Sequence, residues 1–277
     1  MLAALVATAL ALASPGSDPQ DGISVLVTGA AGRTGKILYK YLKEDKRVGE
    51  VRALIYGTGA PKDIQKAKAA LNCSKCDSSE GVYYGDVTKP STLTTSFKGI
   101  DTVAVTTAVG GAGFSNDTLT KLVEFNGVEN QAAALVAGAA DVSKKFLVLC
   151  SASGTGVSPF GPTPSHGPPA FLKDIMWWKL NAEAFLGATG IPNTVVKPCG
   201  LDATYGRGGK QLLVGHDDKL PHDGMISRED LAAVMLEAIV ERAVGLRFDL
   251  CVGNGAPTTD LAKLIKGARY PWDKRAA

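Results

Sequence analysis

Three glycines, each separated from the next by two residues, follow a short apolar run near the start of the chain. Residues 25–35 read VLVTGAAGRTG, and residues 33–42 continue in a helical pattern. Gly29 permits a tight turn out of the strand, Gly32 lets the backbone approach a pyrophosphate, and Gly35 lets the helix pack closely on the sheet. The free amides and the positive dipole end of that helix suit phosphate. The spacing is GxxGxxG rather than GxGxxG, so a purely structural glycine turn stays an alternative.

The cysteines give a second set of residues with possible chemistry. There are five, so at least one is unpaired, and such a sparse set predicts no dense disulfide framework. Cys73 and Cys76 form a CxxC pair, but zinc would need a second pair or two suitably spaced histidines. We therefore predict two exposed or weakly paired thiols in a loop insertion, and no metal site.

Strand-like and helix-like segments alternate along the chain, and they must position the glycine loop. The predicted strands cover residues 23–27, 50–56, 82–84, 102–106, 145–150 and 193–197. The predicted helices cover residues 34–44, 63–71, 89–97, 117–138 and 175–188. This alternation predicts an α/β fold with a doubly wound parallel sheet, whose ligands lie beyond the carboxyl ends of the strands. Residues 154–169, rich in glycine and proline, predict a mobile flap beside that cleft.

The composition and the N-terminal residues limit the possible partners and domain organisations. The chain has 277 residues, 45% of them apolar, and a net charge of +3 carried by scattered lysines and arginines, which argues against a nucleic-acid partner. Leu2–Ala13 is apolar but too short for a stable membrane span, and it resembles the hydrophobic part of a signal peptide. A stray extension is the alternative. We expect residues 1–21 to be a leader and residues 22–277 to form one domain, with a C-terminal lobe from about residue 200.

Several motifs after the glycine loop occur in the order found in one protein family. They are Gly85-Asp86-Val87, Thr106-Thr107-Ala108, Cys150-Ser151-Ala152-Ser153, Trp178-Lys179 with Ala182-Glu183, Ile191-Pro192 with residues 196–201, and the later ISREDLAAVML run. Together with TGAAGRTG at residues 28–35, this order resembles the short-chain dehydrogenase/reductase superfamily in its atypical NmrA-like branch, and is similar to plant plastid members. The likeness covers roughly residues 22–266.

The resemblance implies a Rossmann-like doubly wound parallel sheet, a small C-terminal substrate lobe and a dinucleotide cofactor. The residues that it implies for the cofactor are Gly29, Ala30, Ala31, Gly32, Arg33, Thr34, Gly35, Asp86, Val87, Thr106, Thr107, Ser151, Lys179, Pro198, Cys199, Gly200 and Leu201. It also implies two catalytic residues: Ser151 to orient a substrate, and Lys179 to hold the nicotinamide ribose.

The choice of cofactor depends on the end of the second strand. An NAD binder usually places Asp or Glu there, where it takes the ribose hydroxyls and repels a 2′-phosphate. This strand ends in Tyr56-Gly57 with no acid, which favours NADP(H) over NAD(H). Many relatives of this kind place an arginine where Tyr56 falls. Arg33, inside the glycine loop, is the candidate cation for the phosphate, with a solvated loop arginine as the alternative.

The expected proton donor is missing from the sequence. The family mechanism uses a tyrosine four residues before the lysine, and Ile175 occupies that position relative to Lys179. Three options follow. Ser153, His166 or water could donate the proton, the acceptor could take hydride with little acid help, or the chain could bind cofactor without turnover. A solvated helix lysine is the alternative for Lys179.

These observations favour an NADP(H)-dependent oxidoreductase that transfers hydride to a small carbonyl or quinone-like acceptor. The alternative is a non-catalytic NADP(H)-binding redox sensor or assembly scaffold. The expected partners are the dinucleotide and a small-molecule substrate. The signal-like leader favours a plastid, with the secretory pathway and the cytoplasm as alternatives.

Overall fold

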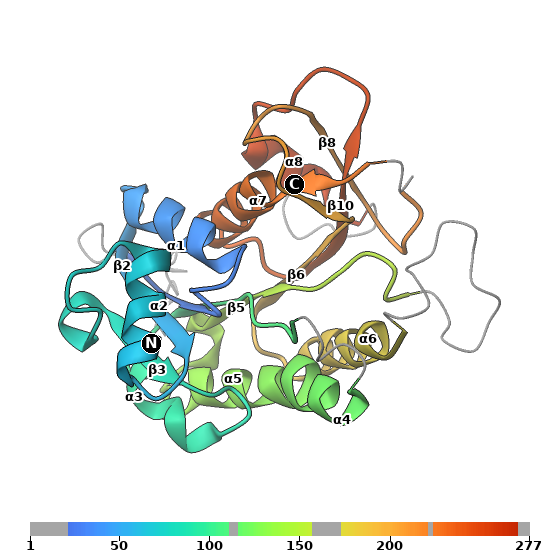
Figure 1. Cartoon of the computed structure of the whole chain (residues 1–277). Coiled ribbons are helices and arrows are strands. Elements are labelled where there is room, and N and C mark those ends of the chain that lie inside the picture. Colours follow the sequence, from blue (N-terminus) through green and yellow to red (C-terminus); the bar gives the residue numbers. More distant parts are fainter. Residues whose placement is uncertain (1–21, 111–115, 157–172, 221–223, 271–277) are drawn as a thin grey trace, which may run out of the picture.

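The computed structural model describes residues 22–110, 116–156, 173–220 and 224–270. The predicted leader, His166 and nearly all of the predicted flap lie outside these ranges. Within them, eight strands form one sheet in the order β3-β2-β1-β4-β5-β6-β10-β8 (Figure 1). The bounds are β1 Ile23–Thr28, β2 Val48–Tyr56, β3 Val82–Gly85, β4 Thr102–Val105, β5 Phe146–Cys150, β6 Asn193–Pro198, β8 Gln211–Gly215 and β10 Leu246–Gly253. Strands β3 to β6 follow the Rossmann order, so the predicted fold class is confirmed.

The pairing in this sheet is parallel everywhere except at one edge. Strand β10 runs parallel to β6, and β8 pairs with β10 in the antiparallel direction. The C-terminal part of the chain therefore extends the main sheet by two strands. The short strands β7 (Leu201–Asp202) and β9 (Ile226–Ser227) pair separately and in parallel.

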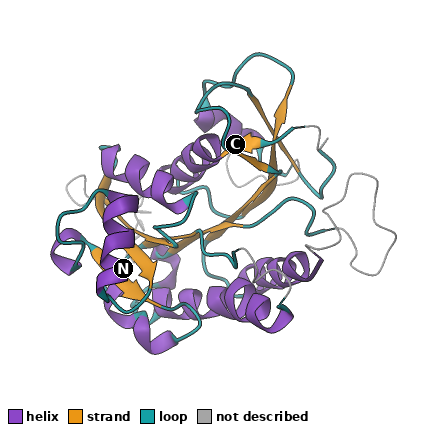
Figure 2. Ribbon diagram, in the orientation of Figure 1, coloured by secondary structure: helices purple, strands orange, loops and turns teal. Residues whose placement is uncertain are grey.

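Helices cover both faces of the sheet (Figure 2). Residues Val25 and Val27 of β1 point to one core and Leu26 to the other, as the alternation of a strand requires. The first core includes side chains of α1 (Gly35–Glu44), α2 (Pro61–Leu71), α7 (Arg228–Val240) and α8 (Leu261–Gly267). The second includes side chains of α3 (Thr94–Phe97), α5 (Gly127–Val136) and α6 (Lys173–Ala188).

The helix predicted over residues 117–138 has an irregular middle. It consists of α4 (Asp117–Thr120), a π-helical turn η4 (Lys121–Asn126) and α5. π-Helical turns are frequent at functional sites, and this one contains the buried Glu124. The predicted brief helix over 89–97 is likewise split, into a 3₁₀ turn η2 (Pro90–Thr92) and α3. Two further 3₁₀ turns, η1 (Ser78–Glu80) and η5 (Val142–Lys144), precede β3 and β5.

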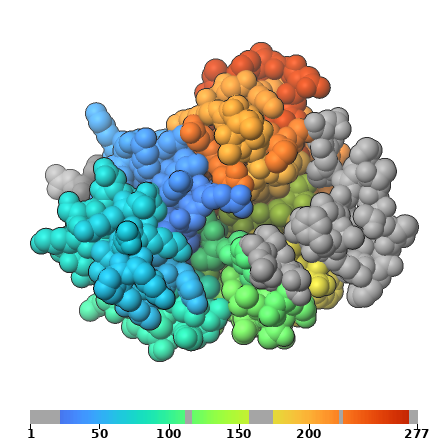
Figure 3. All heavy atoms as spheres, viewed as in Figure 1, coloured from blue at the N-terminus to red at the C-terminus, as the bar shows by residue number. Residues whose placement is uncertain are grey.

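The C-terminal segment packs against the helix that follows the glycine loop. Helices α1 and α7 lie side by side, and Figure 3 shows the blue N-terminal segment directly against the orange segment. The Tyr41 hydroxyl donates to Glu229, and Arg47 pairs with Glu237 at 3.1 Å. This contact fixes the start of α7 near the glycine loop.

The expectation of two exposed or weakly paired thiols at Cys73 and Cys76 is wrong. The two cysteines form a disulfide, and Cys76 is fully buried against the first core. The left-handed backbone of Cys76 and its amide, which donates to the Glu80 carboxylate at 2.7 Å, turn the side chain inward. Among the described residues, the one group of His, Cys, Asp and Glu side chains close enough to share a metal ion is Cys73, Cys76 and Glu80.

A second disulfide joins Cys199 and Cys251, which lie 52 residues apart in sequence and next to each other across β6 and β10. Cys150 is a free thiol. In the described part of the chain, no helix is both long and apolar enough to cross a membrane.

Candidate functional site

The glycine loop forms a close-packed turn between β1 and α1. Gly29 has a φ of +72°, and a Cβ there would lie 2.9 Å from the Thr106 carbonyl oxygen. A Cβ on Gly35 would overlap the Gly29 carbonyl and the Thr106 hydroxyl. The turn has no side-chain cap: Thr34, just before α1, makes no capping bond, and the amides of Lys36 and Ile37 already donate to the carbonyls of Gly32 and Thr34. This is a cradle that side chains would fill, and it fits a diphosphate.

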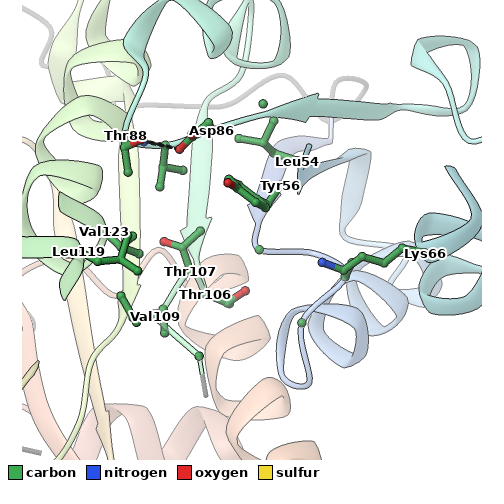
Figure 4. A pocket seen from close by; sticks show the side chains of 17 residues that line it. Leu54, Tyr56, Lys66, Asp86, Thr88, Thr106, Thr107, Val109, Leu119 and Val123 are labelled. Atoms are coloured by element: carbon green, nitrogen blue, oxygen red, sulfur yellow. Dashed lines mark hydrogen bonds between the residues drawn. The ribbon is translucent and has the colours of Figure 1, made fainter. Parts of the chain in front are cut away.

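Two cavities lie on either side of this loop. The first, which we call the Tyr56 cavity, has a volume of about 440 Å³ (Figure 4). It is lined by Gly29, Ala31, Gly32, Leu54, Tyr56, Lys66, Gly85, Asp86, Val87, Thr88, Thr106, Thr107, Ala108, Val109, Gly110, Leu119 and Val123. Many of these residues lie at or just after the carboxyl ends of β1 to β4.

The polar groups of the Tyr56 cavity are held by local contacts. One Asp86 carboxylate oxygen accepts from the Thr88 amide at 2.9 Å and from the Thr88 hydroxyl at 2.7 Å. Tyr56 is 70% exposed, and Lys66 reaches from α2 with its ammonium end directed toward the cavity (Figure 4). Lys66 was not foreseen from the sequence, because helix residues one turn apart on an exposed face all look alike.

The second cavity, the Lys179 cavity, has a volume of about 760 Å³. Besides Ala31, Gly32 and residues 106–110, which line both cavities, it is lined by Arg33, Thr34, Cys150, Ser151, Ala152, Ser153, Gly154, Ile175, Met176, Lys179, Pro198, Cys199, Gly200, Leu201 and Arg228. Its wall therefore contains charged groups from the first and last thirds of the chain.

Lys179 is held by a buried ion pair. Its Nζ lies 2.8 Å from Glu124 Oε2, and both side chains are nearly inaccessible to solvent. Glu124 Oε1 also accepts from the Val109 amide at 2.7 Å. Burial alone would lower the pKa of Lys179, but the Glu124 carboxylate raises that pKa above its ordinary value. The alternative of a solvated helix lysine is thus wrong, and Lys179 carries a positive charge at the cavity wall.

Ser151 is committed to a second buried carboxylate. Its hydroxyl donates to Glu183 Oε1, and Glu183 Oε2 pairs with Arg247 at 2.7 Å and accepts from Thr155 at 3.2 Å. Because a hydroxyl has one proton, Ser151 can only accept a hydrogen bond from a ligand in this arrangement. Glu183 was part of the Ala-Glu motif in the sequence, but nothing there indicated its partners.

An apolar side chain, Ile175, occupies the position at which the family mechanism places its tyrosine. Ile175 is 4% exposed and lines the Lys179 cavity one helical turn before Lys179. Cys150 lines the same cavity, and burial raises the pKa of its thiol to about 11. That thiol is neutral near pH 7, so neither residue replaces the tyrosine as a tuned acid.

A third buried charge cluster fixes the loop that leads from β5. Asp218 accepts from the amides of Gly154 and Gly156, each at 2.6 Å, and pairs with Lys197 at 2.8 Å. Lys197 also pairs with Asp249 at 3.1 Å. Burial alone would raise the pKa of Asp218, but the hydrogen bonds from Lys197 and from these amides lower it to about 2. Ser153 and Gly154 line the Lys179 cavity, so this part of its wall is tied to the C-terminal segment.

Most of the predicted cofactor residues line one cavity or both. Gly29, Asp86 and Val87 line the Tyr56 cavity, and residues 198–201, Ser151 and Lys179 line the Lys179 cavity. Arg33 lines only the Lys179 cavity. Two predicted residues line neither: Ala30 is fully buried in the first core, and Gly35 packs against Gly29 and Thr106.

Comparison with known proteins agrees with this architecture. A family model described as NAD(P)H-binding matches residues 29–242. The chain belongs to the NAD(P)H-binding family of atypical short-chain dehydrogenases/reductases. The family binds NAD(P)H and has an oxidoreductase function.

Individual relatives come from plants. An uncharacterized chloroplastic protein of Arabidopsis thaliana is 31% identical over 88% of this chain and 75% of its own length. Sanguinarine reductase of Eschscholzia californica is 26% identical over 92% of this chain and 100% of its own length. Among solved structures, a Bacillus halodurans protein assigned as an NAD-dependent epimerase/dehydratase superposes with a TM-score of 0.67 and 18% identity, over 89% of this chain and 100% of its own, which shows the shared fold.

Proposed function

We propose that this chain is an NADP(H)-dependent reductase that passes hydride to a small carbonyl or quinone-like acceptor in the Lys179 cavity. The observation that supports the proposal is the buried Lys179–Glu124 pair, which holds a positive charge at the wall of a cavity beside the glycine loop, in a chain of an NAD(P)H-binding family. An ammonium in that position suits the hydroxyls of the nicotinamide ribose. A charge buried in this way is costly unless a partner or a function maintains it.

The preference for NADP(H) is supported by charge at the Tyr56 cavity. Strand β2 ends at Tyr56 without an acid that would repel a 2′-phosphate. Lys66 supplies a cation there, whereas Arg33 lines the other cavity. We therefore assign the 2′-phosphate to Lys66 instead of Arg33.

Titration of the purified protein with NADPH and NADH, followed by fluorescence, tests this preference. We expect Lys66→Gln to weaken NADPH binding about tenfold, the effect of losing one charge-assisted bond, and to leave NADH binding within about twofold. Lys68→Gln is the matched control, because Lys68 is an exposed lysine on the same helix and lines neither cavity. Equal losses for both dinucleotides would refute the assignment.

The residues around the nicotinamide end favour an acceptor that needs little acid help. The bound dinucleotide would supply the hydride. Ile175 offers no proton and Ser151 donates to Glu183, so proton uptake by a reduced acceptor falls to water or to the Lys179 ammonium. The apolar side chains of Ile175, Met176 and Leu201 exclude water from part of this cavity and suit a flat conjugated ring.

An acceptor screen that follows loss of the absorbance of reduced nicotinamide tests turnover. The panel should contain quinones, conjugated carbonyls and sanguinarine, because sanguinarine reductase is a relative over the whole of its length. With an active acceptor, Glu124→Gln combined with Lys179→Met should lower turnover about a hundredfold or more while preserving the fold, since it removes both charges together. Wild-type turnover by this double variant would contradict the role of Lys179.

A non-catalytic NADP(H) sensor is the second candidate, and the closed wall at Ile175 favours it. Saturable NADPH binding without turnover of any acceptor in the panel would support the sensor and refute the reductase. Absence of saturable binding to either dinucleotide would refute both.

A plastid location is proposed on the leader-like residues 1–21 and on the chloroplastic Arabidopsis relative. Sequencing the N-terminus of the mature protein from isolated plastids tests it. Recovery of the protein with residues 1–21 intact from another compartment would contradict this location.

A further inference from the structure

Two arginines from distant parts of the chain face the Lys179 cavity. Arg33 comes from the glycine loop, and Arg228 is the first residue of α7 in the C-terminal segment. Burial lowers the pKa of Arg228, and the charge of Arg33 lowers it further, as expected for two nearby like charges. The packing of α1 against α7 brings these two parts of the chain together (Figure 1).

Neither guanidinium is neutralised by a carboxylate within the described residues. Arg228 Nη1 donates to the backbone carbonyl of Asp202 at 3.2 Å, and the Asp202 carboxylate exerts only an opposing long-range charge. The Arg33 side chain is exposed and makes no ion pair in the described part of the chain. By contrast, Lys179 at the same wall has Glu124 at 2.8 Å. Two like charges beside one cavity repel each other, and an anion that binds between them would remove this repulsion.

The position of the two arginines relative to the glycine loop identifies the anion. Gly32 and Ala31 line both cavities, so the loop is the wall that a dinucleotide must cross with its diphosphate. Arg33 and Arg228 line only the Lys179 cavity, beyond that crossing. The phosphate on their side is the one attached to the nicotinamide ribose.

We propose that Arg33 and Arg228 form a two-guanidinium site for the nicotinamide-side phosphate of the dinucleotide, so that the C-terminal segment supplies part of the cofactor site. Arginine suits this task because its planar donors match phosphate oxygens. Arg228 is held in place by local structure: Ser227 caps α7 through Asp230, and β9 pairs with β7 just before it. The proposal rests on the proposed function in two respects: a dinucleotide binds, and its nicotinamide half lies in the Lys179 cavity.

Two fragments of NADP separate the ends of the diphosphate. Adenosine 2′,5′-bisphosphate carries only the adenosine-side phosphate, whereas 2′-phospho-ADP-ribose carries both. We expect Arg228→Gln to weaken binding of 2′-phospho-ADP-ribose and of NADPH about tenfold, and binding of adenosine 2′,5′-bisphosphate by less than twofold, as measured by calorimetry. Arg228→Lys keeps the charge but loses the planar donors, so its affinity for these two ligands should lie between that of Arg228→Gln and that of the wild type.

The matched control is Arg207→Gln, because Arg207 is an exposed arginine of the same segment that lines neither cavity. It should bind all three ligands as the wild type does, and thermal unfolding of each variant checks the fold. An Arg228→Gln protein that binds 2′-phospho-ADP-ribose like the wild type would overturn the proposal. Equal loss of affinity for both fragments would overturn it too, as would a loss of affinity for the substrate alone. Failure of the wild type to bind NADPH would instead refute the proposed function.

Discussion

The Tyr56 cavity and the Lys179 cavity share the glycine loop but differ in what holds their walls. In the Tyr56 cavity, Asp86 is bonded to a residue two positions away, and the lysine and tyrosine at the edge are exposed. Behind the wall of the Lys179 cavity, buried carboxylates join residues from different elements: Glu183 accepts from the lining residue Ser151 and also pairs with Arg247, 64 positions away. We therefore expect substitutions of the polar groups in the Tyr56 cavity to affect folding little, and loss of one partner from a buried pair behind the Lys179 cavity to destabilise the fold.

The substitution with the largest expected effect on stability removes the charge of Glu124, the partner of Lys179. We expect Glu124→Gln to lower the free energy of unfolding by about 3 kcal/mol at pH 7, because it leaves a buried ammonium without its counter-ion. Urea denaturation measures the change. Adding Lys179→Met to this variant should recover most of the loss, because no unpaired charge is then left.

The matched substitution in the Tyr56 cavity is Asp86→Asn, which also converts an acid to an amide. Because an amide oxygen can still accept from Thr88, we expect it to cost less than about 1 kcal/mol. Similar losses for the two variants would show that the two cavities do not differ in this way.

The next test uses the pH dependence of stability at Asp218. The pKa of this group is lowered in the folded state from 3.8 to about 2, so its stabilising contribution is complete above pH 3.8 and is lost as the pH falls through about 2. We therefore expect Asp218→Asn to be less stable than the wild type by about 2 kcal/mol at pH 6, with the gap closing between about pH 4 and pH 2. The cost is smaller than for Glu124→Gln, because Lys197 keeps Asp249.

Asp217→Asn is the control for this acid dependence. Asp217 is the preceding residue, but its side chain is 56% exposed, and its ion pair with Lys219 is long, at 4.0 Å. It should follow the wild-type curve at every pH. A constant gap between Asp218→Asn and the wild type down to pH 2 would rule out titration of Asp218 as the cause.

The same contrast explains what the sequence could and could not predict. The fold class, the glycine loop and the place of Asp86 after the third strand could be predicted from local patterns: the alternation of strands with helices, the glycine spacing and the Gly85-Asp86-Val87 motif. The partners in the buried ion pairs could not be predicted from such patterns. Glu124 lies in a helical stretch where an acid usually faces solvent, and only the π-helical turn and the approach of α6 bring it to Lys179.

The cysteines illustrate the same limit. Cys199 and Cys251 are unremarkable in sequence, and the pairing of β6 with β10 makes them neighbours. Lys66 and Arg228 were missed for a related reason: each sits on a helix whose placement beside the cleft depends on packing across the sheet.

A small effect is also expected at Ser151, which lines the Lys179 cavity. Because Glu183 keeps Arg247 and Thr155 when the Ser151 hydroxyl is removed, Ser151→Ala should lower the free energy of unfolding by only about 1 kcal/mol. Ser153→Ala is the matched control: its hydroxyl lies 3.4 Å from Asp218, a long contact, so it should cost less.

The turnover rate then tests whether the Ser151 hydroxyl donates to the substrate or stays bonded to Glu183. A serine that donated to the substrate in the transition state would be worth about a hundredfold in rate, whereas a hydroxyl committed to Glu183 contributes mainly by shaping the wall. We expect Ser151→Ala to retain turnover within about tenfold of the wild type, with NADPH affinity unchanged within about twofold. A hundredfold loss of turnover in Ser151→Ala, with unchanged stability, would contradict this expectation. It would mean that the Ser151 hydroxyl leaves Glu183 and donates to the substrate when ligand binds.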